Sequence, residues 1–195
     1  PYRRQRQMCI RDSNELFGHF DIPLYGKHMV ANAAAAITIA KELGLTVEKI
    51  HELLETFHNA KRRFAETKIG NCVIIDDYAH HPTEIKVTLE AVKQKYPNKR
   101  LVVVFVPNTY SRTKDFKNEF VEAFNIADKT YLTEIDCNRE RQEDYPGITS
   151  HIIVDNLKDG DMISIDTINK LKDEKDSVVC FICPLYTSDA ADDKA

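Results

Sequence analysis

The sequence predicts an α/β fold: a mostly parallel, doubly wound (Rossmann-like) sheet with helices on both faces. From residue 72 onward, strand-like apolar runs alternate with helix-like stretches, which is typical of parallel strands joined by crossover helices. The run Leu101-Val102-Val103-Val104-Phe105 is apolar throughout, as expected for a strand buried on both faces. Another such run ends in a dense polar cluster, Asp76 to Glu84. Ligands of open α/β sheets bind at that carboxyl edge.

A smaller helical unit is expected before the sheet. His19 to Leu24 has the character of a strand. The alanine-rich stretch from Val30 to Leu43 has high helix propensity. Thr46 is a good cap for a second helix, whose apolar residues recur at helical spacing: Val47, Ile50, Leu53, Leu54 and Phe57. This helical hairpin, within residues 14–60, is too small to be a domain by itself.

The sheet itself is predicted to occupy residues 61–182. Its expected strands are Cys72–Ile75, Leu101–Val106, Thr130–Leu132, Met162–Ile165 and Val178–Ile182. Helix-like stretches lie between them, at Pro82–Lys95, Thr113–Phe124, Ser150–Leu157 and Thr167–Lys172. This regular alternation predicts a mostly parallel, doubly wound sheet.

Composition excludes several classes of function. The chain has 195 residues, 43% hydrophobic and 30% charged, which is ordinary for a soluble globular protein. A net charge of -4 gives no basic footprint for nucleic acid, and no apolar stretch is long enough to span a membrane. The five cysteines are odd in number and scattered, which favours a reducing cytoplasm. Cys180 and Cys183 have the spacing of a redox motif, but they lie on an apolar, strand-like run without a second pair, which favours core packing or an artefact over a redox or zinc site.

The two ends of the chain are related through the genetic code. Arg3 to Asp12 can be written as CGT CGG CAG CGT CAG ATG TGT ATA AGA GAC. The reverse complement of this DNA, read in another frame, gives the sequence from Leu185 to Asp192. A basic arm and an acidic tail would not explain such an inversion. We therefore predict that residues 1–13 and 183–195 are translated sequencing-library adapter and do not belong to the fold.

The candidate chemistry lies where two expected strands end. Asp77, Tyr78 and His80 follow one strand, and Arg112 follows the other, on loops that we expect to be adjacent. An arginine can grip a carboxylate or phosphate with two parallel hydrogen bonds. A carboxylate near an arginine can hold a ribose hydroxyl, and an imidazole can orient an amine or take its proton. The set suits an anionic, amine-bearing small molecule beside a nucleotide, whereas His81 is expected to pack or cap.

Two segments nearer the N-terminus add candidate binding residues to these four. His28 and Asn32 are four residues apart and therefore share one helix face. An asparagine amide can read an adenine edge through paired hydrogen bonds. Arg63 belongs to the basic run Lys61-Arg62-Arg63, which alone indicates a solvated face but beside a nucleotide site becomes a candidate phosphate clamp.

Four motifs, in this order, carry a family resemblance: Gly26 to Ala33, Arg62 to Phe64, Asp76 to Glu84 and Phe105 to Thr113. Together they resemble the Mur ligases of bacterial cell-wall synthesis, over roughly residues 14–182. The resemblance implies that residues 14–60 are the tail of the central ATP-binding domain and that residues 61–182 are the C-terminal domain.

The resemblance also implies the reaction and its participants. ATP, with Mg2+, would phosphorylate the carboxylate of UDP-N-acetylmuramate, and the amine of L-alanine would attack the resulting acyl phosphate. Asn32, with His28 on the same face, would contact adenine, Arg63 the phosphates, and Asp77 the ribose. Tyr78, His80 and Arg112 would receive L-alanine.

Departures from the family pattern concern both substrates. Met29 stands where the family usually has Asn, and Val106 and Asn108 stand where it usually has Gln and His. The sequence also contains no Gly-x-x-x-x-Gly-Lys-Ser/Thr phosphate loop. We expect this chain alone to be inactive, and most magnesium ligands to lie outside it.

Two readings from other classes remain open. One is a metal-dependent phosphohydrolase, because neighbouring Asp and His side chains can hold divalent metals; its ligands would be Asp76, Asp77, His80 and His81. The other is a non-catalytic α/β module that binds a nucleotide or an amino acid.

Overall fold

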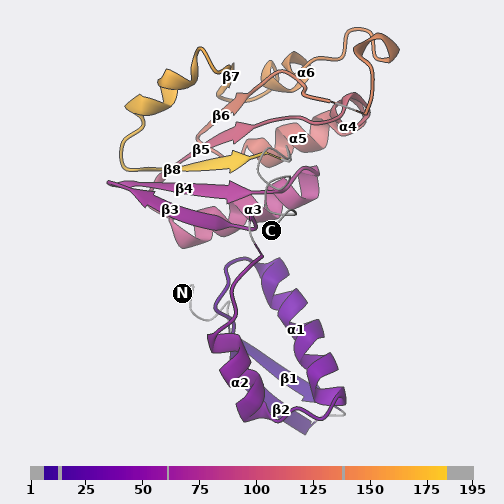
Figure 1. The fold of residues 1–195 in the computed structure, drawn as a ribbon, viewed down its shortest axis with the longest axis vertical. Coiled ribbons are helices and arrows are strands. Elements are labelled where there is room, and N and C mark those ends of the chain that lie inside the picture. Colours follow the sequence, from indigo (N-terminus) through magenta and orange to yellow (C-terminus); the bar gives the residue numbers. More distant parts are fainter. Residues whose placement is uncertain (1–6, 13–14, 61, 138, 184–195) are drawn as a thin grey trace, which may run out of the picture. The chain divides into compact units, whose positions relative to one another are not determined.

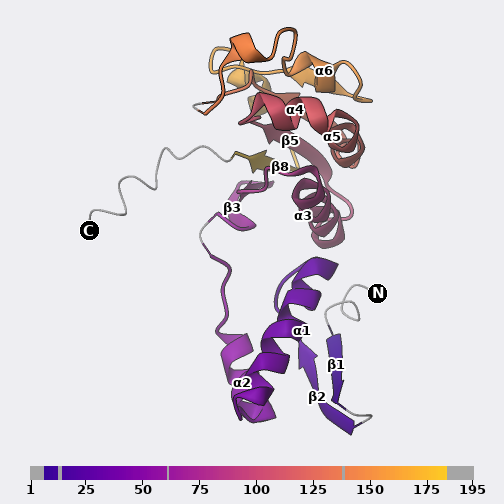
Figure 2. The same cartoon turned by 90° about the vertical axis from the view of Figure 1, so that its right-hand side faces the viewer.

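The computed structural model describes residues 7–12, 15–60, 62–137 and 139–183. The chain divides into two compact units, Pro1–Ala60 with Glu90–Pro97, and Lys61–Leu89 with Asn98–Ala195 (Figures 1 and 2). No helix within the described ranges is long and apolar enough to cross a membrane.

The first unit pairs a β-hairpin with two helices. Strands β1 (Gln7–Asp12) and β2 (Glu15–Asp21) are antiparallel, and helices α1 (Lys27–Glu42) and α2 (Val47–Glu55) follow. Its buried core consists of Phe20, Ile22, Ile37 and Ile50, with Met8 and Ile10 of β1 packed against it.

The helical part of this unit agrees with expectation. Thr46 caps α2 by accepting a hydrogen bond from the backbone N–H of Lys49 at 3.3 Å. The expected strand over His19–Leu24 lies earlier, because β2 ends at Asp21, before Pro23, which has no N–H to donate. β1 falls within residues 1–13. The adapter origin of that segment stays a prediction.

The second unit is built on a six-stranded sheet with strand order β3-β4-β8-β5-β6-β7 (Figure 1). Strands β4 (Cys72–Asp77), β8 (Ser177–Ile182), β5 (Arg100–Phe105), β6 (Lys129–Leu132) and β7 (Gly160–Met162) are all parallel. β3 (Ala65–Ile69) pairs antiparallel with β4 and was not expected, because it is mostly exposed and lacks an apolar face. The predicted fold class, a mostly parallel α/β sheet, is confirmed.

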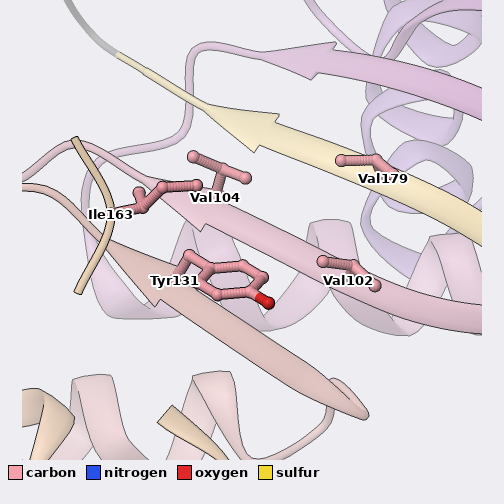
Figure 3. Close-up of a cluster of buried hydrophobic side chains, with 5 residues drawn as sticks. All are labelled: Val102, Val104, Tyr131, Ile163 and Val179. Carbon is pink, nitrogen blue, oxygen red and sulfur yellow. The ribbon is translucent and has the colours of Figure 1, made fainter. Parts of the chain in front are cut away.

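The two faces of the sheet are covered differently. Helix α3 (Pro82–Lys95) and helix α5 (Lys117–Phe124) lie on one face (Figure 2), where the Phe105 ring is 5.5 Å from the Phe120 ring and 5.0 Å from that of Phe124. The opposite face carries a second cluster, Val102, Val104, Tyr131, Ile163 and Val179 (Figure 3). Leu171 of the 3-10 helix η3 (Ile168–Asp173) packs against that cluster. Alternate residues of β5 therefore enter two separate cores.

Several expected boundaries differ from those observed. The helix expected over Thr113–Phe124 is two helices, α4 (Tyr110–Asp115) and α5, because Phe116 leaves the helical conformation at φ -111°. The helix expected at Ser150–Leu157 is the shorter α6 (His151–Val154), and a short 3-10 helix, η2 (Gln142–Asp144), precedes it. The strand expected at Met162–Ile165 ends at Met162, since Ser164 and Thr167 close a turn through a hydrogen bond of 2.8 Å.

Strand order decides which loops meet at the carboxyl edge. The parallel pairs Asp77–Ile182 and Ile182–Phe105 place the ends of β4, β8 and β5 side by side, in that order (Figure 1). We expected the loops after β4 and β5 to be adjacent. The two strands are not neighbours, because β8 lies between them, but the His81 ring after β4 still packs on Phe116, which follows α4, at 4.8 Å. Chain order alone does not fix strand order in a sheet.

Candidate functional site

The buried carboxylate of Asp77 closes the end of β4. Its side chain is 5% exposed, and its oxygens accept hydrogen bonds from the backbone N–H groups of Phe64, at 2.8 Å, and Ala79, at 2.9 Å. The Thr88 hydroxyl lies 3.5 Å from the same carboxylate. Burial raises the pKa of Asp77, although these hydrogen bonds act in the opposite direction. Asp77 therefore fastens neighbouring backbone from within the protein.

The segment from Arg62 to Phe64 is held against this strand end. The Arg62 carbonyl accepts a hydrogen bond from the Tyr78 N–H at 2.9 Å, while Asp77 holds Phe64. Arg62 and Phe64 both have positive φ, 58° and 53°, which side chains other than glycine rarely adopt. This backbone brings the exposed Arg63 guanidinium to 5.6 Å from the centre of the Tyr78 ring. The two residues with unusual backbone conformation thus flank Arg63 on either side.

The imidazole of His80 lies beside Tyr78. Its ring is edge-on to the Tyr78 ring at 5.5 Å, and its Nδ1 lies 3.1 Å from the Tyr78 carbonyl oxygen. Because a carbonyl only accepts, this contact fixes Nδ1 as the donor in a neutral ring. Nε2 is then the atom that can take a proton.

Glu84 and His81 cap helix α3 just behind this site. Glu84 accepts hydrogen bonds from the N–H groups of His80, at 3.0 Å, and His81, at 3.2 Å. Burial raises the pKa of Glu84, but these two bonds, together with the nearby charges of His80 and Arg63, leave that pKa below its ordinary value. His81 Nδ1 accepts from Thr83 N–H at 3.3 Å, and its ring packs on Phe116 at 4.8 Å, so the expected capping and packing role of His81 is confirmed.

Arg112 stands at the end of β5, on helix α4. Its side chain is half-buried, and its Nη1 donates to the Asn108 Oδ1 at 2.8 Å. The residue before it, Ser111, is bound through its backbone N–H and its hydroxyl to the carboxylate of Glu140. Sequence reasoning missed Glu140, which is 29 residues away from Ser111 and lies in a loop without any recognisable motif.

The remaining candidates, His28 and Asn32, belong to the first unit. Both lie on α1, where His28 is half-buried and Asn32 is exposed. The structure thus gathers Arg63, Tyr78 and His80 at one strand end, with Asp77 beneath them, and places Arg112 two strands away in the same sheet.

These groups offer two cationic side chains, one oriented imidazole and a phenol at a single sheet edge. Such a set can bind anions and receive a proton from an amine. Within the described part of the chain, no three or more His, Cys, Asp or Glu side chains are grouped to hold a metal ion. The Cys180 thiol is fully buried, and burial raises its pKa, as expected for an unreactive core cysteine.

The sequence matches a known protein family. Residues 62–180 match the family described as Mur ligase, glutamate ligase domain. A UDP-N-acetylmuramate–L-alanine ligase of Lactococcus lactis subsp. lactis is 43% identical over 169 residues, covering 86% of this chain and 38% of that protein. The same ligase of Lactobacillus acidophilus is 44% identical over 166 residues, covering 85% and 37%.

Solved structures agree on the fold. A UDP-N-acetylmuramate–alanine ligase from Thermotoga maritima superposes with a TM-score of 0.74 at 24% identity, over 92% of this chain and 39% of that one. The chain thus spans about 38% of the length of the curated relatives that it matches. Because the family match covers more than half of the sequence, the chain belongs to the Mur ligase family.

Proposed function

We propose that this chain is part of an ATP-dependent ligase that joins L-alanine to UDP-N-acetylmuramate. Relatives that bear that name are 43% and 44% identical to it. The observation that carries the proposal is the group at the end of β4, where Arg63, Tyr78 and the oriented His80 imidazole meet. An anion-binding cation beside a proton acceptor is what amide formation from a phosphorylated acid requires.

The reaction proceeds through an acyl phosphate. A carboxylate oxygen of the muramate attacks the γ-phosphorus of ATP, and the bond to ADP breaks. The amine nitrogen of L-alanine then attacks the acyl carbon, the carbon–oxygen bond to phosphate breaks, and the amine loses a proton. Phosphate leaves with one of the original carboxylate oxygens.

Within this reaction we assign the cations and the imidazole to separate tasks. Arg63 binds phosphate oxygens, and Arg112 grips the carboxylate of L-alanine. His80 receives the amine proton at Nε2, with Tyr78 lining the same space. Adenine contact falls to Asn32 and His28 on α1.

The hydrogen bonds of Asp77 bear on its proposed contact with ribose. Both of its oxygens already accept backbone hydrogen bonds, from Phe64 and Ala79. A ribose hydroxyl would have to share one of these oxygens. We therefore assign Asp77 first to holding the segment that carries Arg63, and ribose contact comes second.

Magnesium would offset the charge on the ATP phosphates. The described residues do not include a cluster of three or more His, Cys, Asp or Glu that fits the ion. We therefore propose that most of the Mg2+ ligands lie in the remainder of the ligase.

A metal-dependent phosphohydrolase is the weaker candidate. Its four ligands would have to converge, yet the Asp77 carboxylate points into the protein and His81 uses Nδ1 to cap α3. Asp76 instead lies 3.4 Å from the Arg62 guanidinium. Because Asp76, Asp77 and His81 already have these other partners, they do not converge on one metal ion, and the ligase is favoured.

An isotope experiment on the full-length protein that contains this sequence tests the proposal. UDP-N-acetylmuramate carrying oxygen-18 in its carboxylate is incubated with ATP and L-alanine, and the released phosphate is analysed by mass spectrometry. One labelled oxygen per phosphate is expected. Unlabelled phosphate would contradict the acyl phosphate. Glycine and L-serine, tried in place of L-alanine, test the amino acid.

We also propose which segments of the chain belong to which domain of the ligase. Residues 14–60 belong to the central ATP-binding domain, residues 61–182 to the C-terminal domain, and residues 1–13 and 183–195 to adapter. Sequencing the source DNA across both ends tests the adapter origin. The purified chain is expected to release no phosphate in the presence of ATP, UDP-N-acetylmuramate and L-alanine, and alanine-dependent release would contradict this.

A further inference from the structure

Helix α4, which carries Arg112, has a cap that comes from outside the helix. Thr109 occupies the N-cap position, but its side chain makes no capping hydrogen bond, and its buried hydroxyl has no partner among the described residues. Glu140 takes over that function. One carboxylate oxygen accepts from the Ser111 N–H at 3.0 Å and the other from the Ser111 hydroxyl at 2.5 Å. The first turn of α4 therefore depends on a residue of another loop.

The chain around Glu140 is tied to the same strand end at further points. We call residues 136–145 the capping segment, of which residue 138 is not described. The Asp136 N–H donates to the Pro107 carbonyl at 2.9 Å, at the start of the segment. Near its end, the Tyr145 ring stacks on the Tyr110 ring at 5.8 Å and 15°. Glu140 thus lies between two contacts that join the capping segment to the end of β5 and the start of α4.

Arg112 is the next residue after the one that Glu140 holds. The side chain of Arg112 has a partner of its own: its Nη1 donates a hydrogen bond to the Oδ1 of Asn108 at 2.8 Å. The Arg112 guanidinium also acts electrostatically on the Glu140 carboxylate: burial raises the pKa of Glu140, but hydrogen bonds from Ser111 and this charge leave it below its ordinary value. Both the backbone and the charge environment of Arg112 therefore involve Glu140.

We propose that Glu140 is a positioning residue for the amino-acid substrate: through Ser111 it sets the first turn of α4, and thereby the direction in which Arg112 presents its guanidinium to a carboxylate. This inference rests on the proposed function, in which Arg112 grips the amino acid. Glu140 itself touches no substrate. A bidentate grip on a carboxylate has narrow geometric tolerance, so a shift of the first turn weakens binding without removing the charge.

Steady-state kinetics of the full-length ligase test the proposal. Glu140→Gln keeps the shape but has only one accepting oxygen, and Ser111→Ala removes the hydroxyl bond while leaving the backbone bond. In each variant the KM for L-alanine should rise by about fivefold to tenfold, as for loss of a helix cap. The kcat and the KM for ATP should stay within about twofold, since chemistry and nucleotide contacts are unchanged.

Two controls make the result specific. Glu143→Gln changes a neighbouring exposed glutamate of the capping segment and should leave the KM for L-alanine unchanged. A double variant, Glu140→Gln with Arg112→Lys, should raise that KM by less than the product of the two single effects, because both act on one grip.

The outcomes separate this inference from the proposed function. If Arg112→Ala leaves the KM for L-alanine unchanged, the role of Arg112 in the proposed function is wrong and the inference falls with it. If Arg112→Ala raises that KM but Glu140→Gln and Ser111→Ala do not, only the inference is overturned. Parallel increases in both substrate KM values, with a lower Tm, would mean that Glu140 is merely structural. Should Glu140→Gln fail to fold, Ser111→Ala decides alone.

Discussion

The ends of β4 and β5 present functional side chains in opposite ways. At the end of β4, the bonds that hold Ala79, His80 and His81 are local: Asp77 binds Ala79, and Glu84 binds His80 and His81. At the end of β5, the helix that carries Arg112 is capped by Glu140, from a loop 29 residues away. Local fastening follows as soon as the strand and helix form, whereas distant fastening requires the sheet to be complete through β6.

In the proposed ligase, this difference between the two strand ends relates to their separate tasks. A rigid, locally built strand end suits proton transfer, which demands fixed distances. A strand end capped from another loop can be adjusted by changes in that loop, which suits the recognition of one amino acid among several.

The largest effect is expected at His80. His80→Ala removes the oriented imidazole, and kcat of the full-length ligase should fall on the order of 100-fold or more, as for loss of a general base. His81→Ala is the matched control, because His81 only caps α3 and packs on Phe116. It should lower Tm with little change in kcat. Equal losses of kcat in both variants would contradict the assignment of His80.

The next effect concerns the stability of the β4 end. Asp77→Ala leaves the backbone N–H groups of Phe64 and Ala79 without their acceptor, which should cost about 3 kcal/mol of unfolding free energy. Asp76→Ala removes only a partly exposed pairing with Arg62, worth about 1 kcal/mol or less. Urea unfolding followed by circular dichroism compares the two. A smaller loss for Asp77→Ala than for Asp76→Ala would mean that Asp77 does not fasten the strand end.

The same contrast explains what the sequence could predict. The alternation of apolar runs and helical stretches was enough for the sheet and for α3, whose observed bounds, Pro82–Lys95, match the prediction. The capping role of His81 also followed from local pattern, because its partner Thr83 is two residues away. In each case, short-range periodicity or a helix start carries the information.

What could not be predicted depends on pairing between distant segments. Strand β8 lies between β4 and β5 in the sheet, although β8 comes last in the chain, and nothing in the order of the apolar runs indicates this. Edge strand β3 lacks an apolar face, so alternation gave no signal for it. Glu140 is one acidic residue among several in a polar loop, and only the folded sheet brings it to Ser111.

The smallest effects are expected from the two capping glutamates, and they test the comparison most directly. Folding lowers the pKa of Glu84, so its ionised form stabilises the chain above the ordinary glutamate pKa. That stability is lost as the pH falls through the lowered value. Glu84→Gln should therefore cost about 1 kcal/mol at neutral pH and make unfolding less sensitive to acid.

Glu140→Gln should behave differently from Glu84→Gln. Because its cap serves only the short helix α4, the loss should appear as faster amide hydrogen exchange around Ser111, with global stability nearly unchanged. Glu84→Gln should instead speed exchange at His80 and His81, whose N–H groups it holds. If Glu140→Gln lowered global stability as much as Glu84→Gln, the cap of α4 would be part of the folding core. The end of β5 would then be no more adjustable than the end of β4.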